Sequence, residues 1–151
     1  MKHIHLSAFI KASPEKVWST MLEDATYRQW TEAFNPGSYY QGSWDQGAKI
    51  VFLGPSPEGP GEGGIIGRIK ENRLHEFVSI EYFGEVANGV EDTESENAKK
   101  WVGATESYTF SAKDGGTELV VDLDVMDEYK DTMEKMWEQA LVKLTEMAEQ
   151  A

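Results

Sequence analysis

Residues 127–149 read DEYKDTMEKMWEQALVKLTEMAE, and the apolar side chains in this stretch recur at steps of three and four residues. An α-helix completes one turn in about 3.6 residues, so this spacing places the apolar side chains on one face. That face consists of Tyr129, Met133, Met136, Trp137, Ala140, Leu141, Leu144 and Met147. The stretch therefore predicts one long C-terminal helix, whose apolar face has to be covered by another layer of the protein.

The covering layer is predicted to be a sheet, because apolar and polar residues alternate along most of the chain between residues 37 and 125. Turn sequences such as Asp45-Gln46-Gly47 separate the alternating stretches. The predicted strands are 3–11, 38–44, 48–53, 65–71, 77–84, 101–112 and 118–126. Short connections between successive strands indicate an antiparallel meander.

Two short helices are predicted between the first and second strands. Ser13 can cap a helix that begins at Pro14, where the missing amide proton costs nothing. Residues 24–31 form a second short helix, which places Tyr27 and Trp30 on neighbouring turns. Residues 85–100 are acidic and poor in apolar side chains, so we expect an exposed and mobile loop there.

Composition restricts the classes of partner. The length of 151 residues predicts a single domain over 1–151. Lys and Arg number 14 against 27 Asp and Glu, a net charge of −13, which would repel nucleic acids and anionic bilayers. The absence of cysteine excludes disulfides, thiolate nucleophiles and cysteine-ligated zinc. The first residues lack the apolar core of a signal peptide and no window is long and apolar enough to insert into a membrane, so we expect a cytoplasmic protein.

The glycine-rich stretch GPSPEGPGEGGIIG at residues 54–67 invites three interpretations: a phosphate-binding loop, a linker and a turn. A phosphate-binding P-loop needs a lysine followed by Ser or Thr after its glycines, and residues 59–66, GPGEGGII, supply neither. Gly59, Gly61 and Gly64 match a dinucleotide pattern, but a strand pattern follows instead of a helix. We therefore interpret the stretch as a hairpin connection, and we expect it to border the mouth of a pocket and to exchange amide protons faster than the sheet.

The order of elements is one strand, two short helices, six strands and a long C-terminal helix. It resembles the START-like, or SRPBCC, superfamily, and the local sequence resembles the subfamily related to the C-terminal domain of the activator of heat-shock-protein-90 ATPase. The resemblance rests on the stretches ASPEKVWSTM at 12–21, FNPGSYYQGSW at 34–44, GAKIVF at 47–52, GGIIGRIKE at 63–71, VSIEYFG at 78–84, GGTEL at 115–119 and WEQALVKL at 137–144. It implies an α+β helix-grip fold, in which a curved antiparallel sheet wraps around the C-terminal helix.

Aromatic side chains are the main candidates for a binding site. By strand alternation and helical spacing, the side chains expected between sheet and helix include Trp30, Phe34, Phe52, Tyr82, Tyr108, Phe110, Met133 and Trp137, with the side of Trp44 unsettled. They would either fill a core or line a ligand-sized cavity, and the resemblance favours the cavity. Ligand-binding candidates are thus these nine residues.

Candidates for catalysis and metal binding are fewer. Glu106 shares strand parity with Tyr108, so these two are the acid–base candidates, although a pairing of Glu106 with Arg68 or Lys70 is the simpler expectation. His3 and His5 face the same side of a strand, but further ligands are not in evidence, and we expect no metal site and no cofactor.

Three functions remain open. The first is binding of a small hydrophobic, aromatic or lipid-like ligand in the cavity. The second, implied by the resemblance, is a cyclase- or aromatase-like enzyme acting in the same cavity. The third is a co-chaperone-like interaction, which we expect least, because the chain is acidic and the characterised activator has an additional N-terminal domain that these 151 residues do not contain.

Overall fold

The computed structural model describes residues 1–56 and 61–150. The elements in chain order are β1 (Lys2–Ile10), α1 (Pro14–Leu22), α2 (Asp24–Trp30), the 3-10 helix η1 (Thr31–Ala33), β2 (Tyr39–Gly42), β3 (Lys49–Pro55), β4 (Glu62–Arg73), β5 (Phe77–Ala87), β6 (Val90–Asp92), α3 (Glu96–Lys99), β7 (Thr105–Lys113), β8 (Gly116–Val125), the 3-10 helix η2 (Asp127–Tyr129) and α4 (Lys130–Glu149). This is the predicted α+β helix-grip arrangement.

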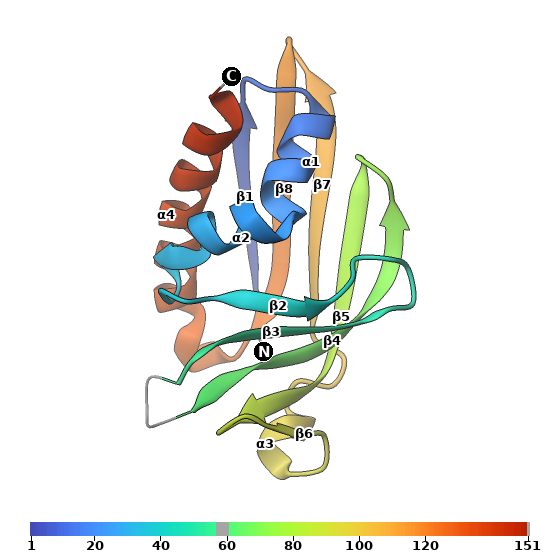
Figure 1. Cartoon of the computed structure of the whole chain (residues 1–151), viewed down its shortest axis with the longest axis vertical. Helices are drawn as coiled ribbons and strands as arrows, with labels where there is room; N and C mark the ends of the chain where they lie inside the picture. The colour runs from blue at the N-terminus through green and yellow to red at the C-terminus, as the bar shows by residue number, and fades with distance from the viewer. Residues whose placement is uncertain (57–60, 151) are drawn as a thin grey trace.

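Eight strands of the described part of the chain form one antiparallel sheet in the order β1-β8-β7-β5-β4-β3-β2, with β6 paired to β5. The helices α1 and α2 carry the chain from one edge strand, β1, to the other, β2. In Figure 1, β2, β3 and β4 cross the view at a steep angle to β1, β8 and β7, and α1, α2 and α4 lie along the same side of the sheet. The sheet therefore curves around the helical layer.

Irregular pairing between β4 and β5 accompanies this curvature. The register shifts between Ile66 and Gly67 and again between Ile69 and Glu71. Such bulges bend a strand and increase its twist. They occur in the two longest strands of the sheet.

The core lies between the sheet and the helices. The apolar face of α4 buries Trp137, Ala140, Leu141, Leu144 and Ala148. The cap predicted for α1 is present, since Ser13 Oγ accepts a hydrogen bond from the amide of Lys16 at 3.2 Å. Tyr129 was expected on the apolar face of the long helix, and this was wrong. It lies in η2, before α4 begins, and is 54% exposed.

Residues 85–100 were expected to be an exposed, mobile loop, and the structure contradicts the loop, because the segment contains regular elements. β5 continues to Ala87 and turns through Asn88 and Gly89, which have φ of 53° and 75°, into β6. An Asn-Gly pair favours this type of tight hairpin, because both positions require positive φ. Ser95 then caps α3, whose Ala98 is buried. As a result β7 begins at Thr105, not at residue 101.

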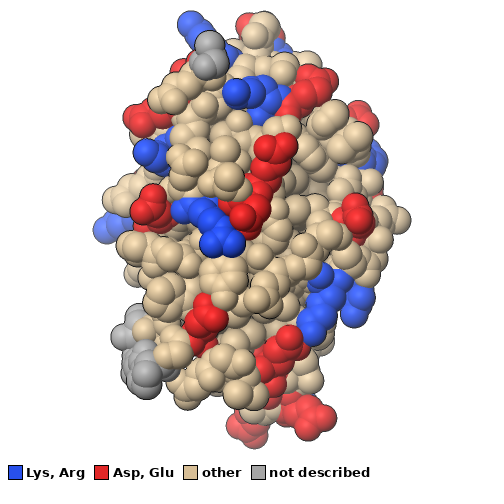
Figure 2. Space-filling model, in the orientation of Figure 1, with Lys and Arg blue, Asp and Glu red and all other residues tan. Residues whose placement is uncertain are grey.

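Charged side chains are distributed over the surface. On the face drawn in Figure 2, Lys and Arg side chains are scattered among acidic ones. His3 and His5 do lie on the same side of β1, where both contact Asp122 of β8. Within the described ranges, no group of three or more His, Asp or Glu side chains could hold a metal ion. No helix in those ranges is long and apolar enough to cross a membrane.

Candidate functional site

A cavity of about 300 Å³ lies between the curved sheet, α2 and α4. Its wall combines side chains from both helices and from four strands. The lining residues are Tyr27, Trp30, Thr31, Phe34, Asn35, Ser38, Phe52, Leu53, Gly54, Gly63, Gly64, Ile65, Tyr82, Glu106, Tyr108, Met133 and Trp137. The volume is at the lower end of the roughly 300–1,000 Å³ that is usual for small-molecule sites.

Trp137 is the centre of the aromatic wall on the helical side. It is 3% exposed, and its ring lies 5.7 Å from that of Trp30 and 5.1 Å from that of Phe34. On the sheet side it meets the ring of Tyr108 at 5.9 Å. Met133 lies one helical turn before it on the same face of α4. One residue of α4 thus connects the α2 side of the cavity to the sheet.

The polar part of the cavity is a carboxyl group held by two phenols. The hydroxyl of Tyr82, on β5, donates a hydrogen bond to Oε1 of Glu106 at 3.1 Å. The hydroxyl of Tyr108 donates to Oε2 of the same carboxyl group. Glu106 and Tyr108 lie two residues apart on β7, so their side chains point to the same side of the sheet. The cavity therefore has one acidic group in a largely aromatic wall, with Thr31, Asn35 and Ser38 as its other polar side chains.

The expected pairing of Glu106 with Arg68 or Lys70 was wrong. Arg68 donates from Nη1 to the carbonyl oxygen of Gly47 at 2.9 Å, and Lys70 lies 3.7 Å from Glu81. Both basic residues are exposed, whereas Ile69 between them is buried. Strand alternation thus turns the two cations away from the face that carries Glu106.

A glycine makes room for the ring of Tyr82. Gly67, on β4, is buried and pairs with Tyr82. A Cβ atom added at Gly67 would lie 2.7 Å from Cγ2 of Ile80 and 3.1 Å from Cδ1 of Tyr82. Real Cβ atoms essentially never lie within 3.0 Å of another atom, so a larger residue would force Ile80 to move and would press the Tyr82 ring outward by a few tenths of an ångström.

Burial determines the protonation of the polar groups. It raises the pKa of Glu106 above its ordinary value, and the hydrogen bonds from Tyr108 and Tyr82 oppose this rise. Burial, together with the charge of Glu106, raises the pKa of Tyr82 and Tyr108 well above the usual value. Burial likewise raises the pKa of Tyr27. The three tyrosines are therefore neutral donors near pH 7, and Glu106 is the group that titrates most readily.

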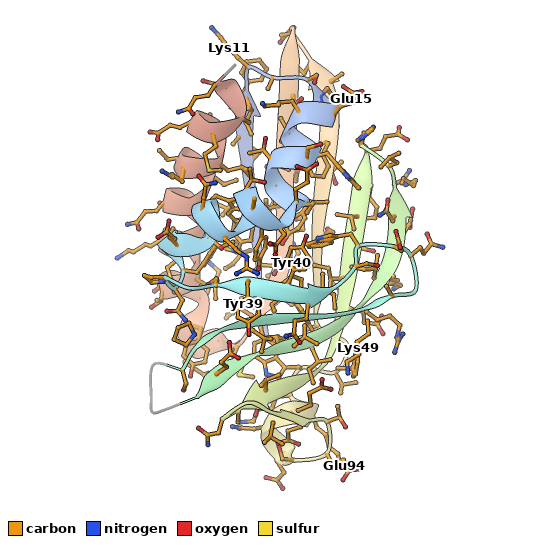
Figure 3. The ribbon with its side chains drawn as sticks, viewed as in Figure 1. Lys11, Glu15, Tyr39, Tyr40, Lys49 and Glu94 are labelled. Carbon is orange, nitrogen blue, oxygen red and sulfur yellow. The ribbon has the colours of Figure 1, made fainter. Side chains whose placement is uncertain are left out.

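Hydrogen bonds between segments distant in sequence lie beside the lining residues Asn35, Ser38, Gly54 and Gly63, and we call this region the rim of the cavity. Asn35 donates from Nδ2 to the carbonyl oxygen of Pro55 at 2.8 Å. Tyr39, on β2, donates to Oε2 of Glu62 at 2.5 Å. Its neighbour Tyr40 donates to the carbonyl oxygen of Leu22 at 2.6 Å, which ties β2 to the end of α1 (Figure 3). The first two bonds join the chain after α2 to β3 and β4, and the third joins it to α1.

The glycine-rich stretch lies beside this rim. Gly54, Gly63 and Gly64 line the cavity, in agreement with the expected place of this hairpin at the mouth of a pocket. Residues 57–60 lie outside the described residues, so the expected fast exchange of the hairpin stays a prediction. β3 and β4 pair with each other from Lys49–Arg68 to Pro55–Glu62. The stretch therefore connects two neighbouring strands of one sheet.

The structure brings seven of the nine predicted ligand-binding residues to the cavity wall: Trp30, Phe34, Phe52, Tyr82, Tyr108, Met133 and Trp137. Trp44 and Phe110 do not line it. Trp44 packs against Phe52 and Tyr40 from outside the wall. Phe110 contacts Trp18 of α1, two residues further along β7 than Tyr108 and beyond the end of the cavity.

Some lining residues were missed by sequence reasoning. Tyr27 lies one turn before Trp30 on α2, so its helical spacing could have included it. Thr31 ends the helix predicted over 24–31, four residues after Tyr27, so the same spacing could have included it. Asn35 and Ser38 come from the segment after α2, where no periodic pattern indicates a direction. Their positions depend on the rim hydrogen bonds, which have no signal in the sequence.

Comparisons with known proteins place this geometry in a family. The sequence profile of the family described as Activator of Hsp90 ATPase homolog 1-like protein matches residues 11–149. A sequence search of curated proteins finds no match. Many solved structures share the fold at low sequence identity.

Three of these structures illustrate the likeness. Protein CV1439 from Chromobacterium violaceum has a TM-score of 0.68 and 17% identity, with 100% of both chains covered. The Aha1 dimer from Colwellia psychrerythraea has a TM-score of 0.70 and 16% identity, over 99% of this chain and 97% of that one. CalU16 from Micromonospora echinospora has a TM-score of 0.66 and 15% identity, over 97% of this chain and 75% of that one. Such identities show the fold alone, whereas the profile match spans nearly the whole chain, and the protein therefore belongs to the Activator of Hsp90 ATPase homolog 1-like family, within the START-like (SRPBCC) superfamily.

Proposed function

We propose that this protein binds a small hydrophobic or aromatic molecule in the cavity between the curved sheet and α4. The observation that supports this most is the composition of the wall. Aromatic rings from α2, the segment after it, three strands and α4 surround a volume of about 300 Å³, and a single hydrogen-bonded acidic group interrupts them. Sites for small molecules combine such apolar walls with a few polar groups that orient the ligand.

The size of the cavity restricts the ligand. A volume of about 300 Å³ suits a molecule of one or two rings with a short side chain, and is small for a long acyl chain. A flat ring system could stack on Trp137, Trp30 or Phe34, and phenol hydroxyls could reach its polar atoms. Among the ligand classes considered from the sequence, small aromatic compounds therefore fit best.

The test is a titration with a neutral bicyclic probe, 2-naphthol, followed by amide and indole chemical shifts. Binding in the cavity should perturb the indole N–H signals of Trp30 and Trp137. A Met133→Trp variant should fill the cavity and weaken binding by about tenfold or more. Met147→Trp is the matched control, because Met147 lies on the same helix and packs on the core without lining the cavity. If Met133→Trp bound the probe as tightly as the wild type, the cavity would not be the site.

A second candidate function is acid–base catalysis on the bound molecule. Its specific support is Glu106, a carboxyl group with a raised pKa that faces the cavity and contacts two phenols. A raised pKa suits a group that exchanges a proton near neutral pH. Once a turnover is detected, Glu106→Gln and Tyr108→Phe should each slow it by about a hundredfold or more. An unchanged rate in both variants would show that Glu106 and Tyr108 are not the acid–base groups of that reaction.

A further inference from the structure

We propose that the ligand of this cavity is an organic cation, a compound with one or two apolar rings and a protonated amine that binds Glu106. This inference rests on the proposed binding function and specifies its ligand class. It follows from three features of the wall: the lack of a cationic partner for Glu106, the free acceptor positions on its carboxyl group, and the aromatic faces around it.

Among the described residues, Glu106 has no basic partner. Its two partners in the described structure are the hydroxyls of Tyr82 and Tyr108, and no ion pair joins it to a basic side chain there. Among the described residues that line the cavity, none is Lys, Arg or His. A buried carboxylate without a cation is costly, so the site favours a partner that brings a positive charge.

The carboxyl group has acceptor positions left for that partner. An ionised carboxylate offers about four lone-pair positions, two on each oxygen. Tyr82 occupies one position on Oε1 and Tyr108 one on Oε2. The remaining positions can accept hydrogen bonds from an ammonium group, which donates up to about three. The two phenols also hold the carboxyl group in place before the ligand arrives.

The aromatic wall favours the same charge. Tyr108 and Trp137 have ring centroids 5.9 Å apart, so the phenol that holds Glu106 packs beside an indole ring of the same cavity wall. The faces of Trp and Tyr rings attract cations, most strongly where water is excluded. An anionic ligand would meet both the carboxylate and these negative ring faces. The wall therefore discriminates against anions and favours amines.

The experiment compares tryptamine with tryptophol, which share the indole ring and the two-carbon arm but end in an ammonium and a hydroxyl group. We expect the wild-type protein to bind tryptamine at least about tenfold more tightly at pH 7, measured by calorimetry or chemical-shift titration. Glu106→Gln should remove this difference. Glu81→Gln is the matched control, because Glu81 is exposed on the opposite face of β5, and it should retain the difference.

A second measurement needs no variant. The titratable groups that face Glu106 are Tyr82 from β5, Tyr108 from β7 and Tyr27 from α2, and burial keeps all three neutral at and below pH 7. The affinity of the wild type for tryptamine should therefore rise as the pH is raised through the pKa of Glu106, which burial holds above its ordinary value, and that for tryptophol should not rise.

The outcomes separate the two proposals. If tryptophol bound as tightly as tryptamine, the organic-cation inference would be wrong and the binding function would stand. If 2-naphthol perturbed the cavity residues but neither indole compound did, the ligand class would again be wrong. If none of the three compounds perturbed Trp30 or Trp137, both proposals would fail.

Discussion

Glu106 lies on β7 with its carboxyl group in the cavity, where it accepts hydrogen bonds from one tyrosine on its own strand and one on β5. Burial disfavours its ionised form, and the two phenols partly compensate. A residue of this kind is more often found where a protein binds or transforms something than where it only folds. Its effect on stability can be separated from its effect on binding by varying the pH.

We predict that the stability difference between the wild type and Glu106→Gln depends on pH. Because the folded-state pKa of Glu106 is raised, its stabilising contribution is complete below the unfolded pKa and is lost as the pH rises through the folded pKa. Raising the folded-state pKa by one changes the contribution of this group to the free energy of unfolding by ~1.4 kcal/mol. Urea unfolding from pH 4 to pH 8 should show the wild type losing stability relative to the glutamine variant. A difference that is constant or grows with pH would contradict the assigned direction.

At Gly67 we predict that Gly67→Ala destabilises the protein by about 1–3 kcal/mol, the usual cost of overpacking a core. The added methyl group would collide with Ile80 and Tyr82. Thermal or urea unfolding measures the loss, and the shifts of the Tyr82 ring measure its displacement. Gly63→Ala is the matched control, since its Cβ would meet the carbonyl oxygen of Val86 at an ordinary 3.6 Å. Equal losses of stability in both variants would show that the destabilisation does not come from the lack of space beside Gly67.

At the scale of elements, α4 has one buried face and one exposed face. One face buries Trp137 and its neighbours against the sheet and α2, and the other, with Val142 60% exposed, faces solvent. At one edge of the sheet, β1 is joined to β8 over nine paired residues and by hydrogen bonds from two histidines. Each element allows one prediction.

For α4, we expect Trp137→Ala to lower the free energy of unfolding by about 3–5 kcal/mol, because it removes the ring that contacts Trp30, Phe34 and Tyr108. Val142→Ala, on the exposed face, should change it by less than about 0.5 kcal/mol. Urea unfolding followed by far-ultraviolet circular dichroism compares the two. Similar losses would mean that the helix does not pack as the structure has it.

For the β1–β8 pair, we expect Asp122→Asn to lower the pKa of His3. Hydrogen bonds with Asp122 and Asp124 raise that pKa, so the charged imidazole stabilises the pair below the ordinary pKa, and the effect is lost as pH rises through the folded pKa. The His3 side chain is 55% exposed, so the effect on global stability is small. Titration of the His3 ring protons by NMR measures the change. Asp45→Asn, in the turn after β2, is the control and should leave the His3 curve unchanged.

At the scale of the whole molecule, the net negative charge destabilises the compact folded state. The chain carries −13, and on the face in Figure 2 basic side chains are interspersed with the acidic ones without forming a continuous patch. Like charges held within one small folded surface repel one another more than in an unfolded chain. Salt screens this repulsion, with a Debye length of about 10 Å at 0.1 M.

We therefore predict that the urea midpoint of unfolding rises between ~0.02 M and ~0.5 M sodium chloride. A triple variant, Glu94→Gln, Glu128→Gln and Glu138→Gln, should respond less, because it removes three exposed negative charges. A midpoint that falls with salt would show that the ion pairs of the surface outweigh the net repulsion.

Periodicity alone determined much of this protein. The step of three and four residues determined α4 and its buried face, and alternation by two placed Tyr82, Glu106, Tyr108 and Phe52 on the inner side of the sheet. These patterns depend on local geometry, which each residue and its near neighbours determine. They were sufficient to predict an antiparallel sheet packed on one long helix, with seven of the nine candidate residues on the side that lines the cavity, whereas the helix-grip arrangement was expected from the family resemblance.

Tertiary structure decided whether those side chains meet or leave a space. Alternation indicates which face a residue occupies, but not how far the opposite wall lies from it. That distance depends on the bulges of β4, on Gly67 beside Tyr82, and on rim contacts such as Asn35 with Pro55. The hydrogen bond from Tyr82 to Glu106 likewise depends on the pairing of β5 with β7, because the two residues lie 24 positions apart in the sequence. Long-range pairing and sheet curvature are collective properties of the folded chain, and the cavity exists because of them.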